Sequence, residues 1–236
     1  MNSCRLEETA VRSAWRLLGV VAALNFALVA SASSHLVRVE DWLNIAVGTR
    51  GIPPTWKSGQ KWGQPAYDFA IEQDSTEKVL HVKSRGDSST IVKELKVNVK
   101  DTPILQWRWK AVTLPQGGDS RNEATDDQAL QIYVTFERFP SIARSRIIGY
   151  IWDSTAPEGL VVKSEKSRLV TYIVVRSGAQ HLGKWLTESR NVYEDYKRIY
   201  GEEPNEPVKG VAIATDSDDT KSSAEGYIGE ILFKKP

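Results

Sequence analysis

The feature of this sequence that most constrains its fold is a succession of short segments rich in β-branched and aromatic residues. They recur along the chain and are separated by turn-forming Gly, Pro, Asp and Ser. The expected strands are 36–42, 66–72, 78–84, 90–97, 103–112, 128–139, 146–153, 168–176, 208–215 and 226–233. Because strands and helices do not alternate, the pattern predicts an all-β fold, an antiparallel and jelly-roll-like β-sandwich. One short helix is expected within 187–200, closed by Gly201 and Pro204.

Alternation within two of these segments predicts which side chains face the core. In 103–112, Trp107 and Trp109 alternate with polar residues and are expected inside. The same rule places four apolar side chains of 128–139 inside, namely Leu130, Ile132, Val134 and Phe136. If the two segments pair, their outward faces bring together Arg108, Gln131 and Tyr133. Such a polar, hydrogen-bonding surface is suited to a carbohydrate, although alternation alone also produces a plain solvated face.

The N-terminus has the pattern of a cleaved signal peptide. Arg5, Arg12 and Arg16 precede or enter an apolar run over 17–30, which ends in the small residues of 30–32. We expect cleavage after Ala32, leaving one β-sandwich domain over 33–236 that is periplasmic or secreted in a bacterium. The apolar run is shorter than a membrane span, so no membrane span is expected in the cleaved protein. The alternative is an uncleaved anchor, because Glu7 and Glu8 dilute the basic region.

Composition excludes several classes of function. The formal net charge is +1 and basic residues are scattered among acidic ones, which argues against nucleic-acid binding. The only cysteine, Cys4, lies in the predicted signal peptide, so the domain is expected to have no disulfide, thiolate zinc site or cysteine nucleophile. Motifs of zinc peptidases, serine hydrolases and phosphate-binding loops are absent from the sequence.

Acidic residues form two clusters beside predicted strands. Asp126 and Asp127 lead into segment 128–139, and Asp216, Asp218 and Asp219 follow segment 208–215. Carboxylate and hydroxyl oxygens are ligands that calcium prefers, so these five aspartates are a candidate metal site. Two alternatives remain open. The clusters are solvated turns neutralised by Lys221, or a pair of carboxylates serves a polysaccharide-acting enzyme.

Several short motifs recur in an order that resembles a bacterial family of exported proteins known only as a domain of unknown function. They are Trp107-Arg108-Trp109-Lys110, Leu114-Pro115, Thr125-Asp126-Asp127, Tyr150-Ile151-Trp152, Leu182-Gly183-Lys184-Trp185 and Thr215-Asp216-Ser217-Asp218-Asp219-Thr220. The resemblance covers nearly all of 33–236 and implies a jelly-roll-like sandwich akin to carbohydrate-binding modules. It implies no activity. The sequence departs from the expected pattern near its end, where Gly229-Glu230 replaces an acidic pair.

These observations favour three functions, led by an exported, non-catalytic module that binds a glycan or another polar extracellular ligand. The second is a polysaccharide-acting enzyme with paired carboxylates, and the third is a structural or protein-interaction component of the cell envelope. Whether the two acidic clusters meet, and which strands share a sheet, are the structural facts that decide between the candidate sites.

Overall fold

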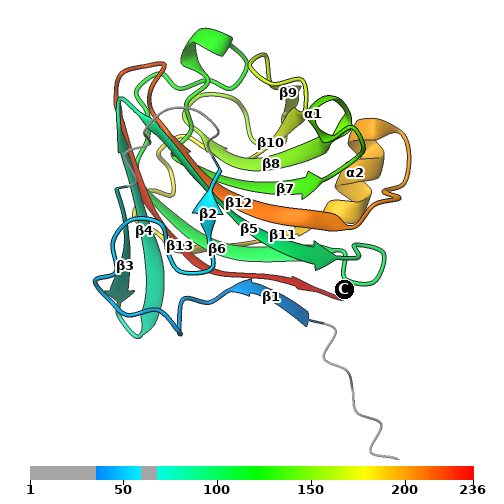
Figure 1. The fold of residues 1–236 in the computed structure, drawn as a ribbon. Coiled ribbons are helices and arrows are strands. Elements are labelled where there is room, and N and C mark those ends of the chain that lie inside the picture. Colours follow the sequence, from blue (N-terminus) through cyan, green and yellow to red (C-terminus); the bar gives the residue numbers. More distant parts are fainter. Residues whose placement is uncertain (1–35, 60–67) are drawn as a thin grey trace, which may run out of the picture. The chain divides into compact units, whose positions relative to one another are not determined.

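The expected strands form two sheets in the computed structural model, which describes residues 36–59 and 68–236 (Figure 1). The predicted signal peptide lies outside these residues. The first sheet, sheet A, has the strand order β11-β6-β13-β4-β3, and β1 pairs with the end of β13. Its strands are β1 (Leu36–Glu40), β3 (Asp68–Asp74), β4 (Glu77–Arg85), β6 (Ile104–Thr113), β11 (Leu186–Asn191) and β13 (Ser223–Lys234).

The second sheet, sheet B, has the strand order β2-β5-β12-β7-β8-β10-β9. Its strands are β2 (Lys57–Ser58), β5 (Ser88–Val97), β7 (Leu130–Phe136), β8 (Arg146–Asp153), β9 (Val161–Lys163), β10 (Val170–Ser177) and β12 (Val208–Asp216). All strand pairs of both sheets are antiparallel except β8 and β10, which are parallel. A crossover connection over 154–169 makes this possible, since two parallel neighbours cannot be joined by a tight hairpin. The predicted β-sandwich is therefore confirmed, with one parallel pair that the sequence pattern did not reveal.

The core between the sheets contains the side chains that alternation placed there. Trp107 and Trp109 of β6 are fully buried, and so are the four predicted core residues of β7. The two indole rings meet edge to face with centroids 5.3 Å apart, and Trp107 lies 5.3 Å from the ring of Tyr150 on β8. Large aromatic rings from both sheets thus fill the centre of the sandwich, where they contribute most to hydrophobic stabilisation.

The predicted helix is shorter than expected, because its first part is a strand. Leu186–Asn191 pairs with β6 as the edge strand β11, and helix α2 runs from Val192 to Tyr200. Asn191 caps the helix by accepting a hydrogen bond from the Glu194 amide, and Gly201 ends it with φ of 71°. Two very short helices, η1 (Glu123–Thr125) and α1 (Ser141–Arg144), lie in connections. Among the described residues, no helix has the length and apolar character needed to cross a membrane.

Candidate functional site

The two acidic clusters of the sequence meet at one end of sheet B. Strands β7 and β12 are antiparallel neighbours, so the start of β7 lies beside the end of β12. The Asp216 amide donates to the Gln128 carbonyl oxygen at 3.0 Å. Asp127 is buried and accepts hydrogen bonds from the Asp219 amide at 3.1 Å and the Thr220 amide at 2.7 Å. The carboxylate of Asp127 therefore holds the turn that follows β12.

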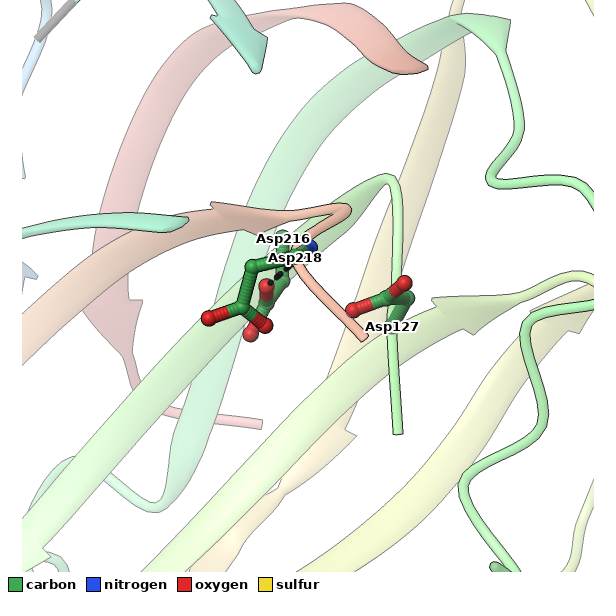
Figure 2. A group of neighbouring side chains, drawn as sticks. All are labelled: Asp127, Asp216 and Asp218. Carbon is green, nitrogen blue, oxygen red and sulfur yellow. Dashed lines mark hydrogen bonds between the residues drawn. The ribbon is translucent and has the colours of Figure 1, made fainter. Parts of the chain in front are cut away.

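Three of the five predicted metal ligands form a compact group, which we call the aspartate triad: Asp127, Asp216 and Asp218 (Figure 2). One carboxylate oxygen from each lies within 4.8 Å of the others. Figure 2 shows the Asp216 and Asp218 side chains together, with Asp127 on the neighbouring segment, and the Asp218 amide donates to Asp216 Oδ1 at 3.3 Å. Burial, together with the charges of Asp218 and Asp127, raises the pKa of Asp216 to about 9. Asp216 is therefore protonated and neutral at pH 7, because the surroundings of the triad do not balance a further negative charge.

The other two predicted ligands have different partners. Asp126 is buried, and its carboxylate accepts from Gln128 Nε2 at 2.7 Å and from the Tyr172 hydroxyl at 3.3 Å. Burial raises the pKa of Asp126 to about 6. Asp219 forms an ion pair with Lys166, whose ammonium also lies 4.0 Å from Asp218 Oδ1. Lys166, and not Lys221 as the sequence suggested, is the cation at this cluster.

The predicted ligand-binding face of Arg108, Gln131 and Tyr133 is wrong, because β6 and β7 belong to different sheets. Arg108 faces outward from sheet A, while Gln131 and Tyr133 lie on sheet B. Gln131 is only 2% exposed, and its side-chain oxygen accepts a hydrogen bond from the Tyr133 hydroxyl.

The connection between β8 and β10 covers this side of sheet B. Tyr133 packs there against a small apolar cluster that includes Ile151, Ala156 and Tyr172. Alternation identified the outward positions of each strand correctly, but it does not show which outward positions remain accessible.

Arg108 instead belongs to a row of aromatic and cationic side chains on the outer face of sheet A, which we call the aromatic row: Trp185, Lys110, Tyr227 and His81, with Arg108 beside Trp185. Tyr227 pairs directly with Lys110 on one side and with His81 on the other. The Lys110 ammonium lies 5.0 Å from the centre of the Trp185 ring and 4.5 Å from that of Tyr227. The ring centroids of Tyr227 and His81 are 4.7 Å apart in a stacked arrangement. Close cation–π and stacking contacts thus connect the three strands β6, β13 and β4 with Trp185, the residue that precedes β11.

Carboxylates from neighbouring strands fix the aromatic row. Asp74, at the end of β3, accepts from the Trp185 indole nitrogen at 2.8 Å and from Lys110 at 2.5 Å. These two hydrogen bonds lower the pKa of Asp74 below its ordinary value, so it is ionised at neutral pH. Glu77 pairs with the Arg108 guanidinium. Trp185, Lys110 and Arg108 are therefore each held in a defined orientation.

Trp185 is the one tryptophan of the described residues that is not buried. Gly229 on β13 gives room to the neighbouring Arg108, since a Cβ at position 229 would lie only 3.1 Å from Arg108 Cβ, whereas its distance of 3.6 Å from Trp185 Cζ3 would be an ordinary contact. Sequence reasoning missed Trp185 and Tyr227 as site residues. Their only sequence signals were the Gly183-Lys184-Trp185 motif and the Gly229-Glu230 departure, and neither reveals the register that brings the rings together.

Solved structures with a similar arrangement of strands share little sequence with this chain. The family 11 carbohydrate-binding module of the cellulase Lic26A-Cel5E from Clostridium thermocellum is 7% identical, with a TM-score of 0.45, covering 86% of this chain and 96% of the module. A family 30 carbohydrate-binding module from the same organism is 9% identical, with a TM-score of 0.44 and coverage of 85% and 97%. A cellulase derived from Cel12A of Rhodothermus marinus is 9% identical, with a TM-score of 0.43 and coverage of 84% and 98%.

Among curated proteins, none matches the sequence. A family model does, and it confirms the resemblance seen in the motifs. Residues 55–232 match the model described as a protein of unknown function, DUF3047. The match extends from the segment before β2 to the last residues of β13, so it includes both the aspartate triad and the aromatic row. This chain is a member of the DUF3047 family.

Proposed function

We propose that this protein is an exported, non-catalytic module that binds a glycan or a similar polyhydroxylated ligand on the outer face of sheet A. The observation that carries the proposal is the aromatic row, in which the half-buried rings of Trp185 and Tyr227 lie among charged hydrogen-bonding groups. The periplasmic or secreted location follows from the predicted signal peptide and is part of the same proposal.

The chemistry of the row matches that of a sugar ring. A sugar presents an apolar face of C–H groups, which packs on an aromatic ring, and hydroxyls at its edge that donate and accept hydrogen bonds. Arg108 and Lys110 supply donors, with 31% and 16% of their side-chain surface exposed, and Asp74 and Glu77 supply acceptors. Because existing hydrogen bonds already orient these groups, a ligand loses less affinity to the ordering of side chains.

The electrostatics of the row favour binding over hydrolysis. A glycosidase needs one carboxyl group that is protonated near the working pH, which requires a raised pKa. Hydrogen bonds from Lys110 and Trp185 instead lower the pKa of Asp74. Glu77 and Glu225 lie in ion pairs with Arg108 and Lys83. The carboxylates of this face therefore serve as hydrogen-bond acceptors in our proposal and not as acids.

A glycan array with the protein purified from an exporting host tests the proposal. We expect binding to at least one class of oligosaccharide, and we expect Trp185→Ala to weaken it by roughly tenfold or more, the loss typical of an aromatic residue at the centre of an interface. Phe139→Ala is the matched control, because Phe139 is an aromatic residue that is 91% exposed on a connection of sheet B.

Thermal unfolding of each variant verifies that it is folded before binding is compared. The proposal fails if the wild-type protein binds no glycan above background. It also fails if a folded Trp185→Ala variant binds as tightly as the wild type.

A further inference from the structure

The cations of the aromatic row are already paired with carboxylates of the protein. Lys110 donates to Asp74 Oδ2 at 2.5 Å, and the Arg108 guanidinium donates to Glu77 Oε2. A ligand that carries a carboxylate or a sulfate could pair with either cation only by displacing its present partner. If the ligand lay beside the ion pair instead, the carboxylate already there would repel its charge.

The charges around these two ion pairs are balanced in the same way. Lys83 lies 3.1 Å from Glu225, and the two ring nitrogens of His81 lie 3.0 Å from Glu72 and 2.9 Å from Glu225. The row and these neighbours thus contain three permanent cations, Arg108, Lys110 and Lys83, and four carboxylates, Asp74, Glu77, Glu72 and Glu225. Even a protonated His81 gives this surface no excess of positive charge. It therefore lacks the positive potential that attracts anionic ligands.

Two of these carboxylates keep an oxygen atom for a ligand. Within the described part of the chain, both hydrogen bonds to Asp74 end on Oδ2, one from Lys110 and one from the Trp185 indole. The hydrogen bond from Arg108 ends on Glu77 Oε2. Asp74 Oδ1 and Glu77 Oε1 can therefore accept from a ligand, and their side chains are 32% and 52% exposed. An ionised carboxylate accepts hydrogen bonds and donates none, so it binds a hydroxyl group and not another anion.

We infer that the ligand of the aromatic row is an uncharged glycan, an inference that rests on the proposed function and narrows it to one class of ligand. The rings of Trp185 and Tyr227 pack against the C–H faces of the sugar, and Asp74 and Glu77 accept hydrogen bonds from its hydroxyls. Glycans with uronate or sulfate groups bind much more weakly, because the cations that would pair with those groups are occupied.

A glycan array that contains uncharged, uronate-containing and sulfated oligosaccharides tests this inference. We expect the glycans whose binding depends on Trp185 to be uncharged, and to bind roughly tenfold or more tightly than any anionic glycan. If the tightest Trp185-dependent ligand is anionic, the inference is overturned while the proposed function stands. If no glycan binds in a Trp185-dependent manner, the proposed function itself fails, and the inference fails with it.

Glu77→Gln tests whether ion pairing causes this selectivity. The probe is the uncharged oligosaccharide that binds most tightly on the array, after partial sulfation. We expect Glu77→Gln to bind this probe roughly five- to tenfold more tightly than the wild type does, because the Arg108 guanidinium is then free to pair with a sulfate.

Glu94→Gln is the matched control, since it removes the same charge and frees Lys57, its partner at 2.9 Å, on sheet B. It should bind the sulfated probe like the wild type. Thermal unfolding verifies that both variants are folded. Equal affinity of the wild type and folded Glu77→Gln for the sulfated probe would overturn the inference, and so would an equal gain of affinity in Glu94→Gln.

Discussion

Replacing Asp195 with alanine is expected to lower the free energy of unfolding by about 3–5 kcal/mol. Asp195 lies on α2, with 7% of its side chain exposed, and accepts hydrogen bonds from the Tyr150 hydroxyl at 3.0 Å and from two nitrogens of Arg190 at 3.0 and 2.5 Å. Tyr150 belongs to sheet B and Arg190 to sheet A. The carboxylate thus connects the helix to both sheets, and its loss leaves a buried hydroxyl and a partly buried guanidinium without their acceptor.

Urea unfolding measures this effect, and Glu194→Ala is its control. Glu194 is the neighbouring residue on α2, but 58% of its side chain is exposed, and its nearest cation, Lys197, lies 3.8 Å away. Such an exposed pair contributes only about 0–1 kcal/mol, so the control should unfold almost like the wild type. Equal stability of Asp195→Ala and Glu194→Ala would show that the connection between helix and sheets contributes little.

The second large effect is expected from Glu40→Ala, which should lower the free energy of unfolding by about 3–5 kcal/mol. Glu40 lies at the end of β1 and its carboxylate accepts from Lys93 at 2.7 Å, from the Trp56 indole at 3.0 Å and from the Trp42 amide at 3.2 Å. The Trp42 and Trp56 rings stack with centroids 5.7 Å apart. Removing the carboxylate therefore leaves Lys93 and a buried indole unpaired and loosens the segment that follows β1.

The effect of Glu40 should depend on pH. Burial by itself would raise the pKa of Glu40, but the hydrogen bonds from Lys93 and Trp56 outweigh it and hold the pKa below its ordinary value of 4.5. The unfolded chain therefore binds the proton more tightly, and the stabilisation is present above pH 4.5 and is lost as the pH falls through the lowered pKa.

Urea unfolding from pH 7 down to pH 3 should show the difference between wild type and Glu40→Gln shrinking below pH 4.5. Glu94→Gln, whose side chain is 69% exposed, is the control and should show little difference at any pH. If the difference in the free energy of unfolding between wild type and Glu40→Gln stays constant down to pH 3, the lowered pKa of Glu40 is contradicted.

The positions of the strands could be predicted from the sequence because alternation is a local property. Segment 103–112 becomes β6 with Trp107 and Trp109 buried, and segment 128–139 contains β7 with its predicted core face. The partner of each strand could not be predicted, since pairing depends on contacts between residues far apart in the chain. For this reason the sequence left open whether β6 and β7 pair, and the binding face that depended on their pairing is absent because they lie in different sheets. The strand β11 was hidden because its residues continue into a helical pattern.

Because strand pairing could not be predicted, one candidate site was visible in part from the sequence and the other was not. The acidic clusters meet because of one strand pair, β7 with β12. The carboxylates before β7 and after β12 were visible in the sequence. The aromatic row depends on the three strands β6, β13 and β4 in register, on Trp185 before β11 and on the hairpin that supplies Asp74. No local pattern links Trp185, Lys110 and Tyr227, which are separated by more than forty residues in sequence. Gln131 was wrongly predicted to bind a ligand because the connection between β8 and β10 covers its side of sheet B. The alternation of apolar and polar residues within β7 gives no information about such a distant segment.

The most direct test of the proposed function is a crystal structure of the protein with the oligosaccharide that it binds most tightly on the array. We expect the sugar to lie on the outer face of sheet A, packed against Trp185 and Tyr227, with its hydroxyls bonded to Arg108, Lys110 or Asp74. A sugar bound on sheet B, or at the loops around the aspartate triad, with Trp185 and Tyr227 free of ligand, would contradict the account.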